Sequence, residues 1–161
     1  AHEQIRDVAV FLMYTGFSWV DYSSLKEQHL VEGVGWKKSR NKSKIFSLPP
    51  LLPQAQKIIS KYGGVEQLPQ MHLDTFNDKI KLLGDEVGVT EEVTGFVLSS
   101  SVFRDTFCSM MENERCADLR TVMAMMGHTN TKQVRNYSSV TPDRIRHELE
   151  SQKGLKELED L

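Results

Sequence analysis

Apolar residues near the start of the chain recur with the spacing of an amphipathic helix. They are Ile5, Val8, Ala9, Phe11 and Leu12. Gly16 allows this helix to stop, and Ser18 is a suitable N-cap for a short second helix that continues to Leu25. The pattern therefore predicts two helices separated by a tight break.

Between positions 29 and 48 the pattern changes to short apolar groups punctuated by Gly33 and Gly35. Short apolar groups bounded by glycine are typical of short strands. The groups are Val31, Val34, Trp36 and Ile45-Phe46-Ser47-Leu48. The basic run from Lys37 to Lys44 would be the turn between two of these strands. We expect one small antiparallel sheet, which ends at Pro49-Pro50 because proline cannot donate to a ladder.

Helical patterns dominate the rest of the chain. The candidate helices cover residues 54–62, 74–87, 99–112 and 118–126, the last with Asp118 as its cap and Gly127 as its stop. Further helices are expected near residues 132–137 and from Thr141-Pro142 onward. The fold class is α+β, mainly α, and the 161 residues suit one domain with a single core.

Composition is that of an ordinary globular protein, with 39% hydrophobic and 26% charged residues. No apolar run approaches the ~20 residues of a membrane-spanning helix. The cysteines Cys108 and Cys116 have no Cys/His metal spacing around them, so we expect reduced thiols in a cytoplasmic protein. We expect neither a metal nor a cofactor.

The formal net charge is −2, whereas nucleic-acid binders usually have a basic face. The charges are unevenly distributed, however. Residues 37–44 carry five cations and no anion, while acidic residues gather in the C-terminal tail. This distribution weakly favours one basic face on an otherwise neutral molecule.

Three segments carry polar groups that folding does not require. Met126-Gly127-His128 is followed nine residues later by Tyr137, Arg104 lies in a predicted helix, and Arg40-Asn41-Lys42 lies in the basic turn. Alone, each has an ordinary explanation: a packing tyrosine, a histidine that satisfies helix carbonyls, a solvated ion pair or surface lysines. Together they supply a nucleophile, cations for a phosphate and a proton donor for a leaving oxygen. Metal-free phosphoryl transfer from DNA needs this combination.

The order of these segments resembles the catalytic domain of the tyrosine recombinases, which include phage and transposon integrases. Residues 15–21, Thr-Gly-Phe-Ser-Trp-Val-Asp, resemble the family's Thr-Gly-x-Arg-x-x-Glu/Asp box. Arg104-Asp105-Thr106-Phe107 resembles the His-x-x-Arg-x-Thr-Phe box. Met126-Gly127-His128 with Tyr137 is similar to the Leu-Gly-His…Tyr segment in both type and spacing.

The resemblance implies a role for each of these residues. Arg104 and His128 would hold the scissile phosphate, and Tyr137 would attack it to form a 3′-phosphotyrosine bond. Lys42, chosen for its position before Leu51-Leu52-Pro53, would protonate the leaving 5′ oxygen. Lys38 and Lys44 stay open as alternative general acids.

Two family positions hold other residues in this chain. Ser18 stands in the place of the first catalytic arginine, and Ser101 in the place of the histidine three residues before Arg104. We hypothesise that Arg40 supplies the missing guanidinium, because it lies two residues from Lys42 and would share a strand face with it. The predicted DNA contacts are Lys37, Lys38, Lys44, Ser101 and Ser18.

The resemblance also implies partners: double-stranded DNA, a homotetramer on that DNA, and no membrane, with the isolated domain a monomer. Residues 142–161 would form a C-terminal helix or tail that either docks on a neighbouring protomer or stays solvated. We expect a fragment without the family's N-terminal DNA-binding domains, acting on the nucleoid in a bacterial cytoplasm. The alternatives are a degenerate recombinase that binds DNA or sibling subunits without cutting, and a helical interaction domain unrelated to DNA.

Overall fold

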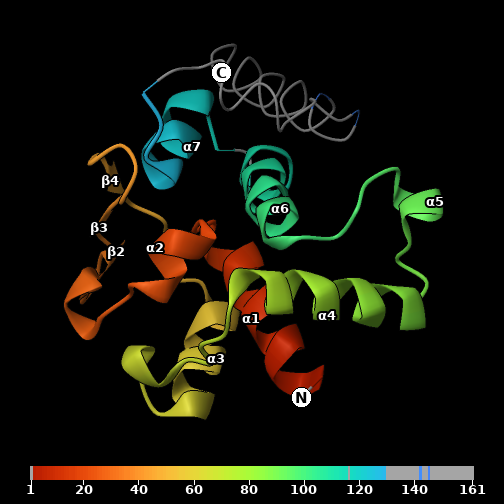
Figure 1. Cartoon of the computed structure of the whole chain (residues 1–161). Helices are drawn as coiled ribbons and strands as arrows, with labels where there is room; N and C mark the ends of the chain where they lie inside the picture. The colour runs from red at the N-terminus through yellow and green to blue at the C-terminus, as the bar shows by residue number, and fades with distance from the viewer. Residues whose placement is uncertain (1, 116, 130–141, 143–144, 146–161) are drawn as a thin grey trace.

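The computed structural model describes residues 2–115, 117–129, 142 and 145 of the chain. Helices dominate this part, and the strands are short (Figure 1). The α-helices are α1 (His2–Thr15), α2 (Trp19–Ser23), α3 (Pro53–Tyr62), α4 (Leu73–Glu86), α5 (Glu91–Thr94), α6 (Ser100–Asn113) and α7 (Leu119–Met126). Two 3-10 helices cover Glu27–His29 and Val65–Gln67. The predicted fold class, mainly α with short antiparallel strands, is confirmed; α5 and the 3-10 helices were not predicted.

Local hydrogen bonds explain where the helices around the site begin and end. The Ser18 hydroxyl accepts a hydrogen bond from the backbone N–H of Asp21 and so caps α2. Asp118 caps α7 in the same way through the N–H of Thr121, and Gly127 ends α7 in the left-handed conformation. These caps and the stop are the ones that the sequence predicts.

The strands form two separate antiparallel pairs, where the sequence predicts one small sheet. β1 (Leu30–Val31) pairs with β2 (Gly35–Trp36), and β3 (Lys38–Ser39) pairs with β4 (Phe46–Ser47). The backbone N–H of Trp36 donates to Pro49 O, but Pro49 has no N–H to return, so the ladder breaks between the pairs. The basic run is also not all turn, because two of its residues form β3.

The main core packs α1 against α3, α4 and α6. Its centre is aromatic: the ring of Trp36 meets Phe11 and Phe17 edge-on, with centroids 5.9 and 5.4 Å apart. A second, smaller cluster joins α6 to α7 through Phe107, Met111 and other buried residues. The packing brings the loop after α1, the β3–β4 hairpin, α6 and the end of α7 together (Figure 1).

The helices predicted near residues 132–137 and after Thr141, and Tyr137 with them, lie outside the described residues, apart from Pro142 and Ile145. Among the described residues, no helix is long and apolar enough to cross a membrane.

Gly16 joins the two cores, and we predict that Gly16→Ala destabilises the fold more than Gly63→Ala. Both glycines have positive φ, 67° and 84°, so either alanine is strained by about 1 kcal/mol. A Cβ at Gly16 would also lie 2.4 Å from the Phe107 ring, whereas one at Gly63 meets nothing within 4 Å. We expect a further loss of about 1–3 kcal/mol at Gly16, measured by urea unfolding. Equal losses would contradict this reading of the contact.

Candidate active site

A cavity of about 390 Å³ lies where the β3–β4 hairpin meets α6 and the end of α7. Within the described part of the chain, its lining includes three cationic side chains and no carboxylate. The lining residues are Arg40, Lys42, Ser43, Ile45, Arg104, Gly127, His128 and Thr129. Cations that converge on one hollow favour an anion such as phosphate.

Arg104 is the most deeply held of these cations, with 9% of its surface exposed. Its guanidinium, carried by α6, donates hydrogen bonds to the backbone carbonyls of Gly16 and Met126, the second at 2.8 Å. The same Nη2 lies 3.0 Å from Nε2 of His128. The loop after α1 and the C-terminus of α7 therefore fix the position of this positive charge.

His128 follows the glycine that ends α7, and its backbone N–H donates to Met123 O at 3.0 Å. Burial, and then the charges of Arg104 and Arg40, lower the pKa of His128 to about 4. The ring is therefore neutral at pH 7, and Nε2 accepts from Arg104, which places the proton on Nδ1. Among the described residues, that buried Nδ1 has no hydrogen-bond partner.

Arg40 reaches the same cavity from the hairpin. Its Nη1 donates to Gly127 O at 3.1 Å, and its side chain is 15% exposed. A Cβ at Gly127 would lie 2.6 Å from Cδ of Arg40, so only glycine leaves room for this approach. Arg40 thus lies with Arg104 and His128 around one cavity, as the hypothesis of a substitute guanidinium requires.

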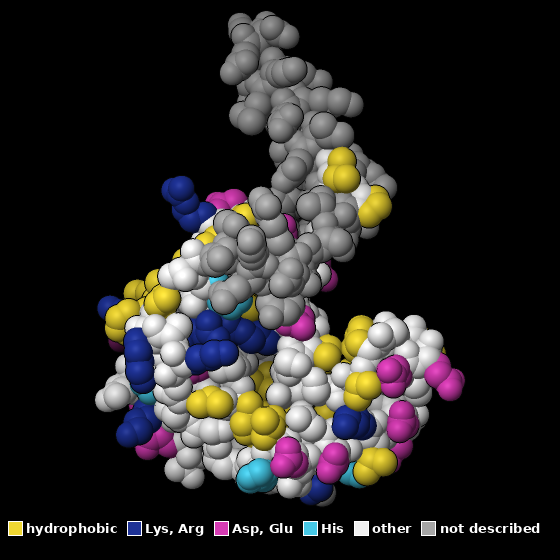
Figure 2. Space-filling view, turned by 45° about the horizontal axis from the view of Figure 1, so that its top comes forward, with side chains coloured by type: hydrophobic (Ala, Val, Ile, Leu, Met, Phe, Trp, Pro, Cys, Tyr) yellow, Lys and Arg dark blue, Asp and Glu magenta, His cyan; other side chains and the backbone are white. Residues whose placement is uncertain are grey.

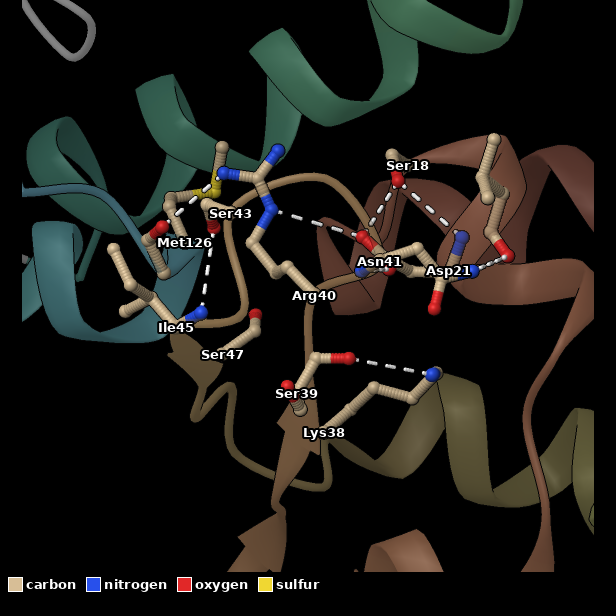
Figure 3. A network of polar contacts seen from close by, with 12 residues as sticks. Ser18, Asp21, Lys38, Ser39, Arg40, Asn41, Ser43, Ile45, Ser47 and Met126 are labelled. Atoms are coloured by element: carbon tan, nitrogen blue, oxygen red, sulfur yellow. Dashed lines mark hydrogen bonds and ion pairs between the residues drawn. The ribbon is translucent and has the colours of Figure 1, made fainter.

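Asp21 anchors the hairpin, and it was not among the site residues predicted from the sequence. It is 2% exposed, and its carboxylate accepts from the Ser18 hydroxyl at 2.6 Å and from the backbone N–H of Asn41 at 2.9 Å (Figure 3). Its Oδ2 also lies 3.7 Å from Nε of Arg40. Its place as the acid of the Thr-Gly box was the available signal.

The two serines in family positions do not line the cavity. The Ser18 hydroxyl caps α2 and donates to Asp21. Ser101 is exposed in the first turn of α6, and its hydroxyl is 2.9 Å from that of Ser99. Neither serine therefore lines the cavity in the place of a catalytic side chain of the family.

The hairpin lysines divide between two faces. Lys38 departs from the expectation of an exposed DNA contact: it is 4% exposed, because it pairs with buried Ser47 on the inner face. Lys37 lies over the ring of Phe46, 5.0 Å from its centroid. Lys42 and Lys44 are exposed, and of the four only Lys42 lines the cavity. Of the three lysines considered as general acids, Lys42 is the one that lines the cavity.

The fold is similar to that of several solved recombinase structures. The XerA recombinase superposes with a TM-score of 0.69 at 15% identity, covering 92% of this chain and 56% of that one. The Tn1549 transposon integrase in complex with circular intermediate DNA gives 0.66 at 16% identity, covering 93% and 60%. The chain has a tyrosine-recombinase-like fold. A lambda integrase dimer bound to a core site shares this recombinase-like fold at a lower TM-score of 0.59 and 12% identity, covering 83% and 51%.

The recombinase-like domain spans between 51% and 60% of the length of these three structures. At 12–16% identity the likeness concerns the fold. Comparison of the sequence with models of known families and with curated proteins gives no match.

We predict that His128 reduces stability in mild acid. Its pKa falls from an ordinary 6.5 to about 4 on folding, so the stability present above pH 6.5 is lost as the pH drops toward 4. Asp105 acts in the opposite direction, since burial raises its pKa to about 6. The comparison is therefore wild type against His128→Gln. The unfolding free energy of the wild type minus that of the variant should decrease as the pH is lowered from 6.5 to 4. A difference that is independent of pH would contradict the lowered pKa.

Proposed function

We propose that the chain is the catalytic domain of a site-specific DNA recombinase that cuts and rejoins strands through a 3′-phosphotyrosine intermediate. The observation that carries the proposal is the convergence of Arg104, Arg40 and neutral His128 on one cavity with Lys42 at its edge. Such a set of fixed donors stabilises charge that develops on a phosphate.

In the proposed cycle, Arg104 and Arg40 hold the scissile phosphate, and His128 donates from Nδ1. Tyr137 attacks phosphorus through its hydroxyl oxygen, whose proton passes to water. The attack displaces the 5′ oxygen of the next nucleotide, which takes a proton from Lys42, and the reverse step returns both protons. The 5′ hydroxyl of another strand later attacks the phosphotyrosine and releases Tyr137. One phosphoester replaces another at each step, so no external energy source is required. Tyr137 is assigned on its sequence position alone.

The proposed partner is double-stranded DNA, and the proposed assembly is a homotetramer on that DNA within the bacterial cytoplasm. The solved structures of similar fold include the Tn1549 integrase in complex with DNA and a lambda integrase dimer bound to a core site, which supports the choice of ligand. Lys44 and Ser101 are proposed to contact the DNA backbone, because both are exposed. Ser18 is engaged with Asp21 and is proposed to act only through it.

A second candidate is a degenerate domain that binds DNA or sibling subunits without cutting. The engagement of Ser18 in the cap of α2, and the position of Ser101 outside the cavity lining, favour this candidate. Both residues stand where the family has catalytic side chains.

We predict covalent capture of DNA by the wild-type chain and none by Tyr137→Phe. The probe is a library of nicked duplexes with randomised sequence, in which loss of the short strand after cleavage prevents religation. Adducts are isolated under denaturing conditions and sequenced. Binding that weakens steeply with salt in both proteins serves as the control for DNA contact. Salt-sensitive binding without any adduct would support the degenerate module instead.

We also predict that Arg40→Ala slows single-turnover cleavage of a captured site by about 10²–10³-fold, as the loss of one oxyanion donor does. The matched control is Lys57→Ala, an exposed cation on α3 that does not line the cavity. In Arg40→Ala, a second change of Ser18→Arg should recover part of the rate, because position 18 borders the same oxygen of Asp21. An unchanged rate in Arg40→Ala would refute the substitute guanidinium.

A further inference from the structure

An acidic and apolar surface surrounds α5. Residues 82–97 contain four acidic residues and no Lys, Arg or His, and none of the residues of α5 itself is buried. We call this segment the α5 surface. Its exposed large apolar side chains include Val87, Val93, Phe96 and Val97, which are 67%, 75%, 44% and 44% exposed. Several exposed apolar side chains thus lie in one short segment, and exposed apolar patches are a common feature of interaction sites.

The outer face of the β3–β4 hairpin has the complementary character. Phe46 and Leu48 are 50% and 43% exposed, and Lys37 lies over the Phe46 ring. Phe46 pairs with Ser39, on the face opposite to the buried pair of Lys38 and Ser47. The outer face, defined by Lys37, Phe46 and Leu48, therefore points away from the inner face. It is apolar and basic where the α5 surface is apolar and acidic.

These two surfaces lie at opposite ends of the molecule. The hairpin is at the left of Figure 1 and α5 projects at the right. Figure 2 shows basic and hydrophobic side chains along the left edge, and mostly acidic and hydrophobic ones, with a basic side chain among them, on the right-hand lobe. One copy cannot bring its own surfaces together, so a contact between them requires two copies.

We infer that the α5 surface of one copy docks on the outer face of the hairpin of the next. The apolar side chains, led by Val93, Phe96 and Phe46, supply the buried area. The acidic residues of the α5 surface pair with Lys37 at its edge, which selects the partner and the orientation. A contact of this kind is heterologous, so repetition either closes a ring or extends a chain.

The proposed contact between copies is argued from the exposure and charge of the two surfaces. It does not depend on whether the cavity cleaves DNA. Two small surfaces make a weak interface by themselves. Binding of both copies to one DNA molecule would raise their effective concentration. The docked surface belongs to the hairpin that carries Arg40 and Lys42, so the neighbouring copy would contact the outer face of the hairpin that contributes to the site.

The test is sedimentation of the full chain over a dilution series at low salt. We predict concentration-dependent association of the wild type. Val93→Asp and Phe46→Glu should each weaken it about tenfold or more, since each places a carboxylate in the apolar centre of the contact. Val20→Asp is the matched control, because Val20 is 57% exposed and belongs to neither surface. Higher salt should weaken the wild-type association.

Mixing the two variants tests the head-to-tail arrangement directly. The Val93→Asp copy retains an intact hairpin and the Phe46→Glu copy an intact α5 surface, so an equal mixture should form a dimer with wild-type affinity that grows no further. A wild type that stays monomeric at every concentration would overturn the inference. So would a mixture that associates no better than its components, or an effect of Val93→Asp without one of Phe46→Glu.

Discussion

The buried guanidinium of Arg104 is the interaction on which the arrangement of the site depends. It lies on α6 but donates to the carbonyl of Gly16, after α1, and to that of Met126, at the end of α7. A buried cation costs free energy unless its donors are satisfied, and carbonyls at helix ends supply partial negative charge that offsets this cost. Because the partners in these two bonds are neutral carbonyls, the contact that joins the segments also places a cationic side chain in the cavity lining.

The remaining charges of the site follow from that centre. His128 packs against the Arg104 guanidinium. Burial first, and then repulsion by the nearby arginine charges, lowers the pKa of His128, so the ring is neutral and one of its nitrogens is a hydrogen-bond donor. Arg40 brings a further cation into the same hollow, and the nearby acid is Asp21, held behind it rather than in the cavity lining. Asp21 tethers the hairpin through the N–H of Asn41 as well, so one carboxylate both balances Arg40 and positions its backbone.

The hairpin has two faces with different tasks. Its inner face carries buried Lys38 and Ser47, and the Ser47 hydroxyl donates to Met125 O of α7 at 2.6 Å. Its outer face leaves Phe46 exposed to solvent. Alternation along a strand separates the faces, so the packing of the hairpin on the body and the proposed contact with a neighbour do not compete.

The sequence by itself determined the longer helices of the described residues, the caps and stop around the site, and the order of the motifs, because each depends on residues within a turn or two of one another. Ser18, Asp118 and Gly127 are local signals of this kind. The sequence also identified Arg104, His128 and Arg40 as candidate phosphate-binding residues, because residue type limits how a side chain can interact with a phosphate. The break in the sheet could have been foreseen only with the register that places Trp36 opposite Pro49.

Only the tertiary structure decided which cations share the cavity and which do not. Lys38 and Lys42 lie four residues apart in one basic run, yet one is buried and the other lines the hollow, because strand pairing and packing on α7 select the face. The approach of Arg40 to Gly127 joins positions 87 residues apart. No local pattern encodes a contact at that separation, since it depends on how α1, α6 and α7 pack around Arg104.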